Sequence, residues 1–459
     1  MSDIQLDRSI LIGLFAMAVG VFVVANDFTA LSVAIPAIEK TFGTDVTTAQ
    51  WVINSYALVF GVVIVTGGRL ADMFGRRRIF VLGSLIFAAF SLLGGLAEEV
   101  WLLVTCRALM GVGGALMWPA IIGLIFEVLP EEKAGLGGAL VTAVAGLGNA
   151  AGPLIGGAFT NTLGWEWIFF INVPITLLGL AVVLAVVPKD RPVNPGERVD
   201  VLGSVILSLG LLALLMALDS GVDRGWTDPL ILGLFLGSAV LLLVFLLVER
   251  RIGDAGLIPP DVMKNRPFLF SVLTTLLIAA VFFGAMVYLP QFMTSQLGFN
   301  AFEAGAGLIP MMLTYAIVSC FTGWVYARLG AKLTVAVGTG FMVCGMLLLS
   351  RIDSANLFKD LVPGMVVLGI GIGLFYSSII SAGVTSLDPS RASLASALIY
   401  MVNVTGGAVG LGMNTAIVAE STSQPEGISL AFTINALLAL LGFVIALLFV
   451  TNKGQQASK

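Results

Sequence analysis

The chain has no histidine and little charge of either sign. Asp, Glu, Lys and Arg together make up 11% of its 459 residues, and hydrophobic residues make up 58%. Soluble domains usually carry about 25% charged residues, which they need to solvate their surface. A chain with so few charged residues cannot form a hydrated surface around a soluble domain. We therefore expect an integral membrane protein made of one membrane domain.

Cysteine is also scarce, and nucleotide-binding loops are absent. Cys106, Cys320 and Cys344 all lie in apolar runs, where a thiol behaves as a small hydrophobic group. The sequence contains neither the Cys-x-x-Cys nor the histidine-rich spacing of usual zinc sites, and without a GxxxxGK[ST] loop we do not expect ATP to drive the protein. We therefore expect no cofactor, no metal and no nucleic-acid partner.

What the sequence does have is long apolar runs. About 20 apolar residues cross a bilayer as a helix. Fourteen runs are long enough: 10–37, 51–70, 79–97, 101–125, 138–159, 167–187, 200–218, 229–248, 268–289, 302–323, 333–350, 361–382, 393–417 and 428–450. An even number places both termini on one side of the membrane.

The Lys and Arg residues fix that side. With both termini in the cytoplasm, eighteen lie there and one, Arg107, lies within a span. Four lie outside: Lys40, Arg224, Arg351 and Lys359. Cytoplasmic loops are enriched in Lys and Arg, so we expect a multi-pass protein of the bacterial cytoplasmic membrane with cytoplasmic termini.

A charged turn at 68–78 separates the second run from the third. It contains Gly68, Asp72 and Gly75, followed by Arg76 and Arg77. Its glycine spacing recurs at an offset of 255 residues, from Gly323 to Gly330, with Ala327 in place of Asp72. Such a parallel repeat predicts two six-helix halves, 1–187 and 267–459, separated by two inserted spans in 188–266.

Three further motifs accompany the turn. The first run contains Asp27-Phe-Thr-Ala-Leu-Ser-Val-Ala-Ile-Pro36, and the fifth contains Gly148-Asn-Ala-Ala-Gly-Pro-Leu-Ile-Gly-Gly157. The sixth begins with Trp165-Glu-Trp-Ile-Phe-Phe-Ile-Asn-Val-Pro174, and Arg107 precedes a glycine-rich stretch in the fourth. Together with the turn, these motifs resemble those of the major facilitator superfamily, in its fourteen-span drug:proton antiporter branch. Met110 and Glu166 depart from the family pattern, where Gln and Arg are usual.

The resemblance implies the fold and the function. We expect an all-α integral membrane protein with the major facilitator fold and 14 transmembrane helices in a 6+2+6 arrangement. It implies a secondary active transporter, not an enzyme, that exports amphipathic and mainly cationic compounds in exchange for protons by alternating access. The expected partners are protons, a small amphipathic substrate and membrane lipids, and the expected functional unit is a monomer.

Asp27, Arg107 and Glu303 are the candidate proton-coupling residues. A charge in the middle of a span costs roughly 2.5–3.5 kcal/mol on insertion scales, so Asp27 is expected to face a cavity or a partner. A structural Asp27 bonded to Asn26, Thr29 or another helix remains open. Arg107 keeps its proton, so it acts either on a nearby carboxylate or as a brace. Glu303 is a second candidate carboxyl, or a solvated helix start.

The remaining candidates fall into two sets. Small or charged residues suited to gates, through close helix contact, a proline bend or a charged latch, are Gly68, Asp72, Gly75, Arg76, Arg77, Gly148, Gly152, Pro153, Gly156 and Gly157. Aromatic, methionine and amide residues on spans expected to line a central cavity are Phe28, Asn54, Tyr56, Met110, Asn149, Tyr288, Tyr400 and Asn403.

Three other functions stay open. One is a nutrient facilitator or proton symporter, which the glycine and proline pattern of the fifth run disfavours. The second is an exporter of a lipid or a siderophore-like metabolite, which would need a fitting cavity. The third is a membrane enzyme or sensor, for which the sequence offers neither a soluble segment nor a clustered nucleophile and base.

Overall fold

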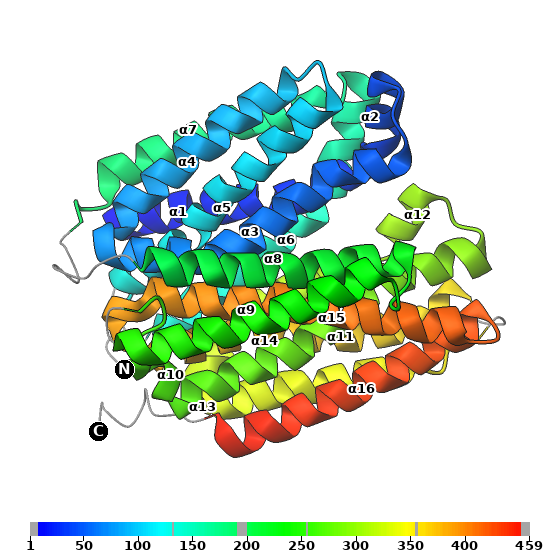
Figure 1. Ribbon diagram of the computed structural model, residues 1–459. Coiled ribbons are helices and arrows are strands. Elements are labelled where there is room, and N and C mark those ends of the chain that lie inside the picture. Colours follow the sequence, from blue (N-terminus) through cyan, green and yellow to red (C-terminus); the bar gives the residue numbers. More distant parts are fainter. Residues whose placement is uncertain (1–7, 131–132, 191–199, 254–255, 354–356, 451–459) are drawn as a thin grey trace. The chain divides into compact units, whose positions relative to one another are not determined.

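The computed structural model describes residues 8–130, 133–190, 200–253, 256–353 and 357–450, and within these ranges all regular secondary structure is helical, without strands (Figure 1). The expectation of an all-α protein is therefore confirmed for the described residues. The helices are α1 (Arg8–Ala30), η1 (Leu31–Val33), α2 (Ile35–Phe42), α3 (Val46–Phe74), α4 (Arg76–Gly95), α5 (Val100–Val128), α6 (Ala134–Thr162), α7 (Glu166–Val186), α8 (Val201–Arg224), α9 (Pro229–Ile252), α10 (Pro260–Lys264), α11 (Arg266–Leu297), α12 (Ala301–Ala306), α13 (Ile309–Leu349), α14 (Phe358–Thr385), η4 (Pro389–Arg391), α15 (Ala392–Glu420) and α16 (Gln424–Phe449).

Polar residues between the apolar runs determine where several helices begin. Asp45, Asp200 and Asn265 accept hydrogen bonds from backbone N–H groups in the first turns of α3, α8 and α11. Such caps satisfy donors that the first turn of a helix leaves without partners. The boundaries therefore follow from side chains at the ends of the apolar runs rather than from the runs alone.

Thirteen helices within the described ranges are long and apolar enough to span a membrane, one fewer than the sequence predicts. The difference arises in a single stretch, Glu303–Leu349, which is 47 residues long. The sequence predicts two spans there. At 1.5 Å per residue a straight helix of this length would extend about 70 Å, more than twice the thickness of a bilayer core.

The chain reverses direction inside this stretch, at Gly330. Its backbone has φ 77° and ψ 173°, which is not helical. Before Gly330, the backbones of Met311 and Tyr315 contact Gly369 and Gly373 of α14, so this part of α13 runs parallel to α14.

After Gly330, the order of contacts is inverted. Gly338 packs against Phe375, whereas Gly345, further along the chain, packs against the earlier residue Leu368. The second part of α13 is therefore antiparallel to α14 and to the first part. Gly330 is the turn between two helical segments.

The same arrangement occurs in α3, α4 and α5. Gly111 of α5 packs on the backbone of Tyr56 in α3, and Gly113 packs on Gly83 and Phe87 in α4. The turn between α3 and α4 is again a glycine with positive φ, Gly75, at 108°. Small residues let the backbones of these helices touch.

The positions of these contacts repeat with the sequence. Tyr56 and Met311 are 255 residues apart, as are Gly83 and Gly338, whereas the glycines that Tyr56 and Met311 contact on α5 and α14 are 258 residues apart. The offset of the charged turn therefore extends to the two helical segments that flank it, and the third segment of each half repeats at an offset three residues larger. The two halves of the chain therefore share a packing pattern, as expected for an internal repeat.

The chain divides into two compact units, residues 1–130, 144–198 and 388–397 in the first and 131–143, 199–387 and 398–459 in the second. α8 and α9, drawn in green in Figure 1, pack on each other within the second unit. Most of the apolar surface of α9 is exposed, including Leu232, Leu236 and Leu243. Such a surface suits contact with lipid.

We expect Gly330→Ala to destabilise the protein by about 1–3 kcal/mol, because the backbone region of Gly330 is essentially restricted to glycine. Gly340→Ala in the same helix is the control: an added Cβ would lie 3.6 Å from Phe443, an ordinary contact. The control should be neutral or slightly stabilising. Thermal unfolding in detergent measures both, and equal midpoints would contradict the assigned turn.

Candidate functional site

A buried ion pair lies within the first unit. Asp27 of α1 and Arg107 of α5 are both fully buried, and Nη1 of Arg107 donates to Oδ2 of Asp27. The other carboxylate oxygen, Oδ1, accepts a hydrogen bond from Nδ2 of Asn172 in α7 at 3.0 Å. Three helices thus contribute one residue each to a single polar centre.

Arg107 has contacts that do not depend on Asp27. Its Nε donates to the backbone oxygen of Val52 in α3 at 2.8 Å, and its guanidinium carbon lies 4.3 Å from the centre of the Tyr56 ring. A cation over an aromatic face is attracted by the ring, more strongly when water is excluded. Two contacts of the guanidinium are therefore independent of Asp27.

Aromatic side chains surround this centre. Phe28, next to Asp27 in sequence, makes edge contacts with Tyr56 at 4.8 Å and with Phe60 at 5.3 Å between ring centres. Tyr56 and Met110 are fully buried. The structure thus brings Phe28 and Tyr56 together beside the ion pair, and an apolar wall next to a charged pair can accommodate an amphipathic group.

The other cavity candidates are spread over both units. In the first, Asn54 and Asn149 are half-buried, and the backbone oxygen of Asn149 accepts from Thr29 at 3.1 Å. In the second, Tyr288 shares a hydrogen bond of 2.7 Å with Thr415, and Asn403 accepts one of 2.8 Å from Tyr376. Tyr400 is half-buried.

The charged turn forms a second polar cluster in the first unit. Asp72, fully buried, pairs with Arg76 at 3.1 Å and accepts the backbone N–H groups of Ser393 and Leu394 at 3.2 and 2.9 Å. These two N–H groups belong to the start of α15. A carboxylate at a helix N-terminus is favourable because the helix dipole is positive there.

Arg76 connects this cluster to neighbouring segments. Its guanidinium donates to the backbone oxygens of Gly123 and Pro389, at 3.2 and 2.6 Å, and pairs with Glu127 at 3.1 Å. Gly68 packs directly on the backbone of Ser393. The cluster therefore ties α3, α4, α5 and the start of α15 together through one arginine and one aspartate.

Asp190, which sequence reasoning did not select, completes the turn. Its two carboxylate oxygens accept the backbone N–H groups of Arg77 and Arg78, both at 2.9 Å, at the start of α4. The carboxylate lies against Gly75, where any side chain would overlap it. The side chain of Arg77 in turn donates to the backbone oxygen of Leu184 at 2.6 Å. The segment after α7 is thus fastened to the turn.

Asp388, just outside the membrane-spanning helices, caps η4 next to this cluster. Hydrogen bonds from the side chain and the backbone N–H of Ser390 lower the pKa of its carboxyl group. The carboxylate therefore stays charged at neutral pH.

The glycine-rich motif of α6 lies against α1. Gly148 packs on Phe22 and Ala25, Gly152 on Thr29, and Gly156 on the backbone of Ala30. Gly157, by contrast, has nothing within 4 Å of an added Cβ. The side chain of Pro153 lies outside the described residues, so its predicted bend remains a prediction.

Glu303 lies at a helix start, which is the alternative to a proton-coupling carboxyl that the sequence leaves open. It is exposed, and with Asn300 it forms a reciprocal capping box at the start of α12, both hydrogen bonds being 2.9 Å. Its place in proton coupling stays an untested prediction.

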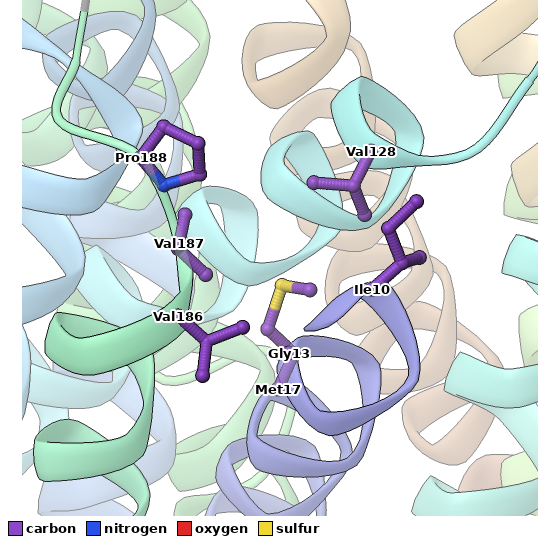
Figure 2. A pocket seen from close by; sticks show the side chains of 7 residues that line it. All are labelled: Ile10, Gly13, Met17, Val128, Val186, Val187 and Pro188. Carbon is purple, nitrogen blue, oxygen red and sulfur yellow. The ribbon is translucent and has the colours of Figure 1, made fainter. Parts of the chain in front are cut away.

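A small apolar pocket of about 210 Å³ also opens in the first unit, between the ends of α1, α5 and α7 (Figure 2). Its lining includes Ile10, Met17, Val128 and Val186. None of the candidate cavity residues lines it, and its lining contains no charged side chain. It is separate from the Asp27 centre.

Comparisons with known proteins agree on one family. The family model described as Major Facilitator Superfamily matches residues 17–411, with a second match over 271–459. The chain is 32% identical to a puromycin resistance protein of Streptomyces alboniger, covering 96% of this chain and 88% of that protein. It is 31% identical to a cephamycin export protein of Amycolatopsis lactamdurans, covering 94% and 89%.

A solved structure is similar in fold. The human organic anion transporter MFSD10 (TETRAN) superposes with a TM-score of 0.70 at 15% identity, covering 96% of this chain and all of that one. At this identity the likeness concerns the fold alone.

Proposed function

Because this chain belongs to the major facilitator superfamily, we propose that it exports amphipathic, cationic small molecules across the bacterial cytoplasmic membrane in exchange for protons. It is a transporter and not an enzyme, of the branch whose relatives are drug and antibiotic resistance exporters. Proton coupling and the charge of the substrate are the proposed elements. The observation that carries them is the buried Asp27–Arg107 pair.

The pair provides one exchangeable negative charge. Arg107 does not release its proton, so only Asp27 can change charge within the pair. Its carboxylate accepts hydrogen bonds from Arg107 and from the amide of Asn172. A proton or a substrate cation bound at Asp27 satisfies the same negative charge, so the two compete.

Arg107 makes this competition reversible. When a proton or a cation takes over Asp27, the Val52 oxygen and the Tyr56 ring still hold the guanidinium. Removing one partner of a buried ion pair otherwise costs about 3–5 kcal/mol. The two remaining contacts reduce that cost, and the pair can re-form after the ligand leaves.

We also propose the architecture that the sequence predicts. The reversal at Gly330 supports fourteen membrane crossings in place of thirteen, and the contacts repeated at offsets of 255 and 258 residues support two six-helix halves with α8 and α9 between them in the sequence. Both termini would then lie in the cytoplasm, as the distribution of Lys and Arg predicts. In this scheme the α1–α6 contact and the Asp72–Arg76 cluster are gates. The functional unit is a monomer.

Transport in proteoliposomes tests the function. An imposed pH gradient should drive uptake of cationic substrates in exchange for protons, and zwitterionic and neutral compounds of similar size should be exchanged more slowly. Uptake in the same direction as the proton would establish a symporter. Exchange independent of the pH gradient would exclude proton coupling.

Charge selectivity gives a more specific prediction. Asp27 is the carboxylate at the polar centre, so a monovalent lipophilic cation should bind at least about tenfold more tightly than a matched dication, whose second charge must be desolvated without a partner. Titration of matched mono- and dicationic dyes at one pH measures the ratio of the two affinities. Equal or tighter dication binding would require a second carboxylate, for which Glu303 is the first candidate.

A further inference from the structure

Two asparagines are fully buried in the second unit without hydrogen-bond partners. They are Asn414 of α15 and Asn435 of α16, both 0% exposed. Neither the nitrogen nor the oxygen of either side chain has a partner within the described part of the chain. An unsatisfied buried polar group costs about 1–3 kcal/mol, so four such atoms together are expensive. Native proteins rarely leave such groups unpaired.

The two side chains converge on one point of α11. A Cβ placed on Gly284 would lie 2.5 Å from Nδ2 of Asn414 and 2.7 Å from Nδ2 of Asn435. Only glycine leaves room for both amides there. Three helices thus build a compact site that offers two donors and two acceptors and carries no charge of its own.

The internal repeat relates Asn435 to Asn172. In α7 the sequence Phe-x-Ile-Asn-x₄-Leu-Leu-Gly runs from Phe169 to Gly179, and in α16 the same pattern runs from Phe432 to Gly442. Gly179 packs against α1, and Gly442 packs correspondingly against α11.

The partners of the two asparagines differ. Asn172 donates to the carboxylate of Asp27, which lies eleven residues after Ala16, a residue of α1 that contacts Gly179. Eleven residues after Thr274, a residue of α11 that contacts Gly442, the chain has Ala285, directly after Gly284. At this place the second half has the amide without the carboxylate. Within the described residues the amides are therefore free to bind a group from outside the chain.

We propose that Asn414 and Asn435 bind an uncharged hydrogen-bonding group of the transported compound, such as a hydroxyl or a carbonyl. The neutral amide pair can donate to and accept from such a group, and it offers no compensation for a full charge. This inference rests on the proposed transport function.

The test uses two cations that differ by one isosteric group, hydroxyethyl-triphenylphosphonium and propyl-triphenylphosphonium. Binding to the purified full-length protein is measured by titration. The hydroxyl compound should bind the wild type about tenfold more tightly, since it gains one donated and one accepted hydrogen bond. The ratio should fall to about one in Asn414→Leu, in Asn435→Leu and in the double variant.

The control variant is Thr433→Val, also in α16. Its hydroxyl is already bonded to the backbone oxygen of Ser429 at 3.0 Å, so the ratio should stay at the wild-type value. The thermal midpoint of each variant is measured alongside. Replacing unpaired amides by apolar groups of similar shape should leave the midpoint unchanged or raise it.

The neutral analogues of the two compounds, with carbon in place of phosphorus, separate this inference from the proposed function. If the phosphonium pair does not bind but the neutral alcohol shows an asparagine-dependent preference, cation export is wrong and the amide site stands. If the phosphonium compounds bind equally in the wild type and neither neutral analogue is preferred, the amide site is overturned and cation export stands. A lowered midpoint in the leucine variants with an unchanged ratio would assign the amides to packing and also overturn the proposal.

Discussion

Asp27→Asn should abolish proton-driven exchange. The substitution removes the only group of the Asp27–Arg107 pair that can change its protonation, while keeping the shape of the side chain. Counterflow of a substrate in the absence of a pH gradient should be slowed as well, because the cation loses its counter-charge. Exchange in proteoliposomes with and without an imposed gradient measures both. A wild-type rate with an unchanged pH profile would remove Asp27 from the mechanism.

Asp27→Asn should also destabilise the protein, so the single variant cannot distinguish a loss of mechanism from a loss of folded protein. Arg107 is fully buried and would lose its anionic partner, at a cost of about 3–5 kcal/mol. The double variant Asp27→Asn with Arg107→Gln removes both charges and should restore the thermal midpoint without restoring proton-driven exchange. Recovery of exchange in the double variant would mean that the single variant failed through instability.

Gly156→Val should reduce exchange at least about tenfold, whereas Gly157→Val should leave it near the wild-type rate. Gly156 packs against the backbone of Ala30, which cannot move aside as a flexible side chain could, and overpacking of this kind costs roughly 1–3 kcal/mol. Gly157 has nothing within 4 Å of an added Cβ, so the neighbouring substitution controls for the lower helix propensity of valine.

Exchange rates and membrane insertion should be measured together for the two valine variants. Both proteins should reach the membrane in equal amounts, because each remains apolar. If both variants exchange substrate equally well, the contact between α1 and α6 is not a gate. An increased proton leak in Gly156→Val would mean that the contact between α1 and α6 prevents protons from crossing the protein.

The sequence predicted individual members of the site better than their connections. Asp27 and Arg107 stand out as charges within apolar runs, and the cost of burying them indicates that each needs a partner. Their pairing with each other joins residues 80 positions apart, and nothing in the local pattern specifies it. Asn172 belongs to a motif that was recognised, but the partner of its amide is visible only in three dimensions.

Features that depend on distant contacts or on a single dihedral angle were missed for the same reason. Asp190 lies in a short polar segment that resembles any connecting loop, and its contact with Arg78 spans 112 residues. The sequence places Gly330 in a repeat but does not specify its backbone conformation. That conformation explains why the described residues contain thirteen long apolar helices where the sequence has fourteen apolar runs. Asn414 and Asn435 carried a usable signal, since an amide in an apolar helix needs a partner.

The net charge of the Asp27–Arg107 pair has a consequence for the membrane voltage. The unloaded pair is neutral, and either a proton or a monovalent cation brings it to one positive charge. Moving one elementary charge through 100 mV corresponds to about 2.3 kcal/mol. Under the proposed exchange, one proton entering for one monovalent cation leaving moves no net charge, so the voltage performs no work, and the pH gradient and the substrate gradient together set the direction. A dication exchanged for one proton would have to move against the interior-negative potential.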